Sequence, residues 1–116
     1  MKKTNYIDDS MENCTEICPI IYTLDIIGQK WKIPILWNIS QQGSVHYNEL
    51  KRLVSSITNT ALTRSLRELE ESDLVLRTNH NTIPPSVEYS LTERGKSLMP
   101  ILQSMYDWGL EQQSGH

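Results

Sequence analysis

The chain has 116 residues, 38% of them hydrophobic and 22% charged, and its formal net charge is −3. This length and composition suit one ordinary globular domain, and no apolar run approaches the roughly 20 residues that a membrane-spanning helix needs. The first residues lack the apolar centre of a signal peptide, and two cysteines do not make a disulfide framework, so we expect a cytoplasmic protein.

Residues 1–16 are polar and show no periodicity, so we expect a flexible N-terminal arm in front of a single domain that spans residues 17–116. The pair Cys18-Pro19 is predicted to begin a short helix, because proline is favoured in a first helical turn. Gly28 stands where a glycine often ends a helix in a left-handed turn.

A second helix is predicted from about Lys30 to Gln42, with Gly43 as its stop signal. Its large apolar side chains point in most directions around the helix axis and do not form a single stripe. That pattern is typical of a central helix that is buried on most sides.

The following segment predicts a helix-turn-helix. Residues 44–46 are short enough for one extended segment, and residues 47–54 have the pattern of a compact helix. A three-residue turn then leads into a longer helix at about residues 58–72, for which Thr58 is the expected cap. Two helices joined by a turn of this length form the motif.

The helix at residues 58–72 has two unlike faces. Leu62, Leu66 and Leu69 recur at spacings of four and three, which place them on one side of a helix. An ordinary amphipathic surface helix explains this apolar side. The other side is small, polar and basic near the helix start, which suits insertion into a DNA major groove. Its residues are Asn59, Thr60, Thr63, Arg64 and Arg67.

Two strands are predicted next, at residues 74–79 and 87–91, from alternating and β-branched apolar residues. The connection between them is too long for a tight hairpin and contains Pro84-Pro85, which removes two backbone donors. A helix-turn-helix followed directly by a hairpin is a winged helix. We therefore expect a mainly α fold with a small β-hairpin, in which the wing occupies about residues 75–91.

A last helix is predicted at about residues 92–113, and Pro100 is expected to kink or split it. Its apolar stripe either packs on its own domain or joins a second copy of the chain. We favour dimerisation, because three other helices are available to cover the core. The stripe consists of Leu98, Ile101, Leu102, Met105 and Trp108.

The charges are unevenly distributed along the chain. From Lys30 to Arg67 there are six bases and a single acid, Glu49. A basic surface on an acidic protein is sufficient for nucleic-acid binding. We expect Lys51, Arg52 and Arg67 to contact phosphates. A solvated surface is the alternative for the first two, and an ion pair with a neighbouring glutamate is the alternative for Arg67.

Several motifs occur in an order that resembles the HxlR-type transcriptional regulators, relatives of the MarR-type winged helices, from about Cys18 to Gly109. They are Cys18-Pro19, Gly28-Gln29-Lys30-Trp31-Lys32, Tyr47-Asn48-Glu49-Leu50, Leu66-Arg67-Glu68-Leu69-Glu70, Pro84-Pro85 with Val87-Glu88-Tyr89, and Leu91-Thr92 with Gly95. The resemblance implies a homodimer that binds double-stranded DNA and controls transcription, with its terminal helices forming the dimer. For some members it also implies a response to oxidants or electrophiles through the cysteine that matches Cys18.

The residues then suggest distinct roles at the DNA. Asn59, Thr60, Thr63 and Arg64 would lie closest to base edges, and arginine is the side chain that best reads guanine. Arg77, His80 and Asn81 would reach the backbone or the minor groove from the wing. A two-fold dimer predicts a pseudo-palindromic operator whose half-sites lie about 34–36 Å apart.

Cys18 is a candidate redox sensor, because oriented N–H groups at a helix N-terminus favour the reactive thiolate. Cys14 lies four residues earlier and is a candidate for an intrachain bridge. Pairing between Cys18 and a cysteine of a second subunit is equally open. The alternative is that Cys18 is a buried capping residue and Cys14 an idle thiol.

No catalytic residue set, glycine-rich phosphate loop or recognised metal-ligand spacing is present in the sequence, so we expect neither an enzyme nor a bound metal or cofactor. A winged helix that binds another protein and not DNA is the alternative function, because fold alone does not decide between them. Any effector pocket is expected between the terminal helices and the wing domain. The aromatic residues Trp31, Trp37, Tyr22 and Tyr106 are candidates for either its lining or the core.

Overall fold

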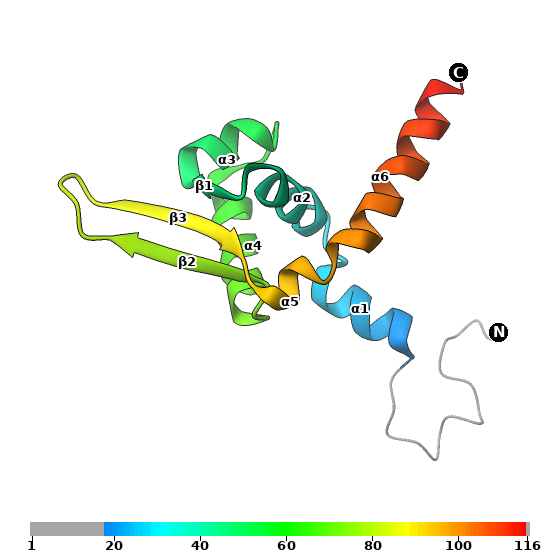
Figure 1. Cartoon of the computed structure of the whole chain (residues 1–116), viewed down its shortest axis with the longest axis horizontal. Coiled ribbons are helices and arrows are strands. Elements are labelled where there is room, and N and C mark those ends of the chain that lie inside the picture. The colour runs from blue at the N-terminus through cyan, green and yellow to red at the C-terminus, as the bar shows by residue number, and fades with distance from the viewer. Residues whose placement is uncertain (1–17, 116) are drawn as a thin grey trace, which may run out of the picture.

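The computed structural model describes residues 18–115, and these form six helices and a three-stranded sheet (Figure 1). In chain order the elements are α1 (Pro19–Ile27), α2 (Lys32–Gln42), β1 (Ser44–His46), α3 (Tyr47–Leu53), α4 (Asn59–Glu71), β2 (Val75–His80), β3 (Ser86–Leu91), α5 (Glu93–Lys96) and α6 (Met99–Ser114). The predicted winged helix-turn-helix is confirmed. The expected arm at residues 1–16 lies outside the described residues.

The sheet has the strand order β1-β3-β2 and is antiparallel throughout. The hairpin β2–β3 pairs Val75 with Leu91 at its base and His80 with Ser86 at its tip. The short segment predicted as extended becomes β1, which pairs with β3 from the other side. In Figure 1 the hairpin projects on one side of the molecule, and α1 and α6 project on the other.

The core lies where α2, α4 and the inner face of the sheet meet. Ile35, Leu36 and Ile39 of α2 are fully buried, as expected for a helix that is apolar on most sides. Leu62 and Leu69 of α4 pack into the same cluster. Burial of large aliphatic side chains contributes about 1.5–3 kcal/mol each, so this cluster is the main source of the domain's stability.

Two glycines end helices in different ways. Gly43 has φ +82°, a conformation that favours glycine, and it stops α2 as predicted. The expectation of a left-handed turn at Gly28 is wrong, because its φ is −80°. Gly28 is instead required by close approach, since a Cβ atom there would clash with the carbonyl oxygen of Leu24.

The C-terminal region is two helices and not one continuous helix over residues 92–113. Thr92 caps α5 by accepting a hydrogen bond from Gly95 N, and Pro100 sits in the first turn of α6, where its missing N–H is tolerated. The predicted split at Pro100 is therefore confirmed. None of the helices within residues 18–115 has the length and apolar character needed to cross a membrane.

Candidate nucleic-acid interface

Helix α4 is fixed in a defined rotation about its axis. Thr58 caps it, its Oγ1 accepting a hydrogen bond of 3.1 Å from Ala61 N, as predicted. Leu62, Leu66 and Leu69 are buried against the core. The two-faced sequence pattern therefore determines which side of α4 reaches solvent.

The opposite side of α4 is an exposed, polar surface that we call the α4 surface. Its five residues line one open hollow of about 440 Å³, and each of them is exposed. They are Asn59, Thr60, Thr63, Arg64 and Arg67. Within residues 18–115 neither arginine forms an ion pair, so the predicted alternative of an Arg67–glutamate pair is not found. Both guanidinium groups are free to meet an anionic partner.

A second hollow of about 330 Å³ lies between α4 and the hairpin and shares Thr63 and Arg67 with the first. Arg77 of β2 reaches it from the sheet and Tyr47 from the start of α3. Glu70 is the acidic residue in its lining. The structure thus brings Arg67 and Arg77 to one concave surface.

The basic residues between Lys30 and Arg67 do not all lie on one surface of the folded chain. Lys32 is only 4% exposed and forms an ion pair of 3.0 Å with Glu68, so it belongs to the interior and not to the basic surface. Lys30 lies over the ring of Trp31, 4.7 Å from its centroid. Of the remaining predicted contacts, Arg52 is exposed on α3 and Lys51 is half-buried beside it.

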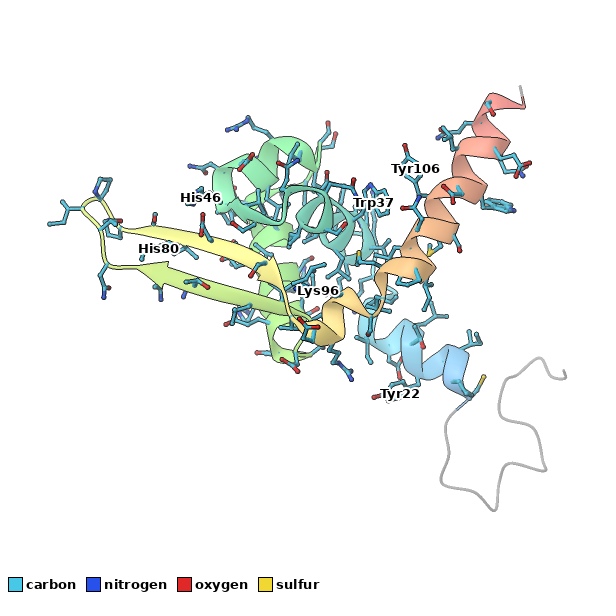
Figure 2. The ribbon with its side chains drawn as sticks, viewed as in Figure 1. Tyr22, Trp37, His46, His80, Lys96 and Tyr106 are labelled. Carbon is cyan, nitrogen blue, oxygen red and sulfur yellow. The ribbon has the colours of Figure 1, made fainter. Side chains whose placement is uncertain are left out.

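The wing carries a cluster of two histidines and one glutamate on the outer face of the sheet. His80 Nε2 lies 2.9 Å from Glu88 Oε1, and His46 Nε2 lies 3.4 Å from Glu88 Oε2 (Figure 2). His80, which was predicted to contact DNA, is hydrogen-bonded to Glu88. Asn81, the next residue, is exposed in the loop.

The proton positions in this cluster follow from its hydrogen bonds. His46 Nδ1 lies 3.1 Å from the carbonyl oxygen of Val87, which only accepts, so Nδ1 carries a hydrogen. His46 Nε2 then donates to the carboxylate only when the imidazole is doubly protonated. The hydrogen bond from His80 is the largest effect that lowers the pKa of Glu88 below its ordinary value of 4.5. The positive charges of the two imidazoles and a hydrogen bond from Ser44 lower this pKa further, and burial opposes them.

One residue of the interface was not predicted. Tyr47 begins α3, and its hydroxyl lies 3.2 Å from Asn59 Oδ1 and 3.2 Å from Thr63 Oγ1 on α4. The spacing of Asn59 and Thr63, four residues apart, places both on one side of a helix. No sequence pattern gives the distance between α3 and α4, so this contact could not be derived from spacing.

The family model described as HxlR-like helix-turn-helix matches residues 26–116 of this chain. The chain belongs to the HxlR-like helix-turn-helix family. The HTH-type transcriptional regulator YybR of Bacillus subtilis (strain 168) is 48% identical over 94 residues, which cover 81% of this chain and 74% of that protein. This HxlR-like protein is therefore a transcriptional regulator of the helix-turn-helix type.

Two solved structures of one relative are similar over most of their length. The redox regulator HypR in its oxidized form superimposes with a TM-score of 0.77 and 45% identity, covering 81% of this chain and 96% of that one. Its reduced form also gives a TM-score of 0.77, with 43% identity, 82% of this chain and 93% of that one. The fold of the HxlR-like protein is thus shared with a regulator known in two redox states.

The terminal helices of the HxlR-like protein leave large apolar side chains in solvent. On α6 the predicted residues Ile101, Met105 and Trp108 are exposed, and Trp108 is 67% exposed. The inclusion of Leu102 in a dimer stripe is wrong, because it is 2% exposed and packs in the core of its own chain. Leu98 also packs against that core. Further exposed apolar residues that the prediction omitted are Ile20, Tyr22, Leu24, Tyr106 and Leu110.

Cys18 occupies the N-cap position of α1, but its side chain accepts no capping hydrogen bond. It is half-buried and free, so it is neither the fully buried capping residue of the alternative nor an exposed thiol. Cys14 lies outside the described residues. Within residues 18–115, no group of three or more histidine, cysteine, aspartate or glutamate side chains is placed to hold a metal ion.

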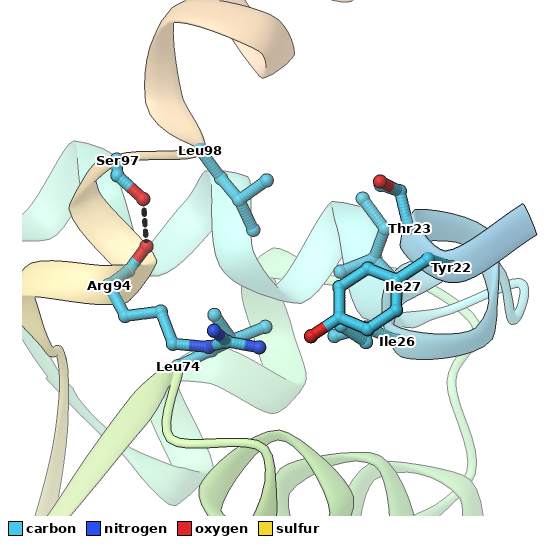
Figure 3. Close-up of a pocket in the computed structure, with 8 residues that line it drawn as sticks. All are labelled: Tyr22, Thr23, Ile26, Ile27, Leu74, Arg94, Ser97 and Leu98. Carbon is cyan, nitrogen blue, oxygen red and sulfur yellow. Dashed lines mark hydrogen bonds between the residues drawn. The ribbon is translucent and has the colours of Figure 1, made fainter. Parts of the chain in front are cut away.

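A cavity of about 160 Å³ lies where α1 meets the junction of α5 and α6 (Figure 3). Its walls are mainly aliphatic, and the guanidinium of Arg94 points across it toward the hydroxyl of Tyr22. Of the four aromatic residues considered for a pocket, only Tyr22 lines this cavity. Trp37 and Tyr106 stack on one another with centroids 4.8 Å apart, joining α2 to α6 (Figure 2).

Proposed function

We propose that this protein binds DNA sequence-specifically as a homodimer and regulates transcription from a pseudo-palindromic operator. The observation that carries the proposal is the α4 surface, which is exposed, polar and free of ion pairs within residues 18–115. A helix of this kind enters a major groove with its N-terminal turns against base edges. The acidic residues of α4 lie toward its other end, away from the turns that carry Asn59, Thr60 and Arg64.

The roles divide by position. Asn59, Thr60, Thr63 and Arg64 lie on the first turns of α4 and read base edges. Arg67 and Arg77 border the hollow toward the hairpin and neutralise phosphates, with Lys51 and Arg52 on α3 doing the same. Asn81 contacts the backbone or minor groove from the wing. His80, which lies 2.9 Å from Glu88, contacts DNA from the same end of the wing.

The dimer is supported by the exposed apolar residues of α1 and α6. Large apolar side chains gathered in solvent on two neighbouring helices are the usual mark of an interaction site. Two-fold symmetry requires the same residues on both copies, and the second copy places a second α4 surface at a matched distance. The operator then contains two half-sites about 34–36 Å apart.

Binding to fragments selected from random DNA tests the proposal. Arg64→Ala is expected to weaken specific binding by about 10- to 100-fold, since one good guanine contact contributes about 1–3 kcal/mol of discrimination. Lys96→Ala is the matched control, because it removes one exposed positive charge on α5, outside the α4 surface. Unchanged specific binding by Arg64→Ala would show that the recognition surface is misplaced.

A salt titration separates this function from a protein-binding winged helix. Neutralisation of phosphates by Lys51, Arg52, Arg67 and Arg77 makes the logarithm of affinity fall steeply and linearly with the logarithm of salt concentration. DNA binding that is absent, or that does not respond to salt, would instead favour a module that binds another protein.

We also propose that oxidation of Cys18 changes DNA affinity. The similarity to HypR, a redox regulator in its printed description, and the free thiol at the start of α1 support this. Diamide removes two electrons and two protons from two thiols and leaves one disulfide, formed by Cys18 with Cys14 or with a cysteine of the second subunit. Gel-shift affinity should change after diamide treatment and remain unchanged in Cys18→Ser. Equal affinity without any bridge by mass would refute the sensor role.

A further inference from the structure

Tyr47 stands between the two helices of the helix-turn-helix. Its ring is half-buried and packs against the core, so the position of its hydroxyl is set by the fold. That hydroxyl lies 3.2 Å from Asn59 Oδ1, 3.3 Å from the carbonyl oxygen of Asn59 and 3.2 Å from Thr63 Oγ1. Asn59 and Thr63 are both exposed members of the α4 surface.

The hydrogens in this group are assigned by counting donors. A phenol has one hydrogen to give, and Tyr47 gives it to the oxygens of Asn59. The contact with Thr63 then needs the threonine hydroxyl as its donor. The chain of hydrogen bonds therefore runs from Thr63 to Tyr47 to Asn59, and it commits the only hydroxyl hydrogen that Thr63 has.

This arrangement determines what Asn59 presents to a partner. An asparagine amide in solvent rotates and exposes its oxygen and nitrogen in either order. Here Oδ1 is the end that lies next to the phenol and accepts its hydrogen, which leaves one lone pair on Oδ1 and two hydrogens on Nδ2. An asparagine that accepts with its oxygen and donates with its nitrogen forms the bidentate contact with adenine N6 and N7.

We propose that Tyr47 is a positioning residue for base recognition, whose hydroxyl orients Asn59 to read adenine at one position of each half-site. The inference rests on the proposed DNA-binding function and adds the base class and the residue that sets it. Thr63 donates its hydroxyl hydrogen to Tyr47, so it presents only its oxygen and its methyl group to the neighbouring base edges.

The test is the base preference of Tyr47→Phe, which keeps the ring and removes only the hydroxyl. Fragments are selected from random DNA with wild type and variant, and affinities are measured for all four bases at each half-site position. We expect the preference for adenine at one position to fall by about five- to tenfold, part of the discrimination that a bidentate contact supplies. Affinity for unrelated DNA and the salt dependence should not change. Ser104→Ala, exposed on α6, is the control that loses a hydroxyl elsewhere.

A second pair of variants shows whether Tyr47 acts through Asn59. Asn59→Ala alone should abolish the adenine preference, and Tyr47→Phe added to it should have no further effect. A uniform loss of affinity for every sequence in Tyr47→Phe, with a weaker salt dependence, would mean that Tyr47 contacts a phosphate and would overturn the inference. An unchanged base profile would also overturn it. Absence of sequence-specific binding in the wild type would refute the proposed function itself.

Discussion

Helices α4 and α6 have different relations between their apolar residues and the core. On α4 the large apolar residues Leu62, Leu66 and Leu69 are buried, and the residues left in solvent are polar. On α6 only Leu102 is buried, whereas Ile101, Met105, Tyr106, Trp108 and Leu110 remain exposed. Burial of apolar side chains therefore stabilises α4 within a single chain, whereas most large apolar side chains of α6 are not buried in that chain.

The difference indicates two kinds of partner. The apolar side of α4 needs no second protein chain, because it is buried within one protomer. Its exposed side is polar and basic and suits a charged polymer that forms hydrogen bonds, such as DNA. A helix with an exposed apolar side suits another apolar surface, for which a second copy of α1 and α6 is the simplest source. The predictions below test this division from the largest effect to the smallest.

Leu69→Ala should lower the free energy of unfolding by about 2–5 kcal/mol, because a fully buried leucine loses its contacts and leaves a cavity. Leu110→Ala, on the exposed side of α6, is the matched control. Its smaller loss should depend on protein concentration if the proposed dimer buries that side chain. Urea unfolding at two concentrations measures both. Equal, concentration-independent losses would remove the distinction between the two helices.

Trp108→Glu should convert the dimer to a monomer while each protomer stays folded. A carboxylate in an apolar interface loses its hydration without a partner, which raises the dissociation constant by more than about a hundredfold. Sedimentation equilibrium gives the mass, and circular dichroism the helix content. Gln113→Glu introduces the same charge on another side of α6, about 140° around the helix from Trp108, as a control. A Trp108→Glu protein that remains dimeric would place the interface away from this surface.

Glu68→Gln tests the polar contact that holds α4 to α2. Removal of the carboxylate leaves the buried ammonium of Lys32 without its anionic partner. Because Glu68 is partly exposed and water can reach it, we expect a loss of about 1–2 kcal/mol, below the value for a fully buried pair. Glu71→Gln, exposed at the end of α4, should change the urea midpoint much less.

The smallest effect concerns the wing. The pKa of Glu88 is lowered, chiefly by the hydrogen bond from His80, so its ionised form is favoured in the folded state. Its contribution to stability is present above the ordinary value of 4.5 and is lost as the pH falls through the lowered pKa. Urea midpoints of wild type and Glu88→Gln should therefore differ above pH 4.5 and converge in stronger acid. Convergence only at alkaline pH would contradict this sign.

The sequence predicted those parts of the fold that depend on hydrophobic periodicity and on residues that start or end helices. The spacing of Leu62, Leu66 and Leu69 was enough to orient α4, and Pro100 was enough to place the break before α6. Spacing alone did not predict whether an apolar residue of the last helix packs on its own core or is left for a second copy of the chain. Leu102 and Met105 belong to the same predicted stripe, yet one is buried and the other exposed. Leu102 lies on the side of α6 that faces α2, as does Tyr106 four residues later, whereas Met105 does not.

The interface was predictable as a surface but not as a set of contacts. The exposed members of α4 followed from the helix pattern alone. Three contacts join residues from different elements: the ion pair of Lys32 with Glu68, the hydrogen bond of His80 with Glu88 and the hydrogen bonds of Tyr47 with Asn59. Such distances depend on how the helices and strands pack, and no spacing within one element reports them.

The most direct test of the central claim, that a dimer presents two α4 surfaces to one duplex, is an operator with five base pairs inserted between its half-sites. The insertion turns one half-site by about half a turn of B-DNA, where a helical turn is about 10–10.5 base pairs. We predict that two protomers bind the natural spacing and that the insertion lowers affinity to that of a single half-site. Affinity that is unchanged by the insertion would contradict the account.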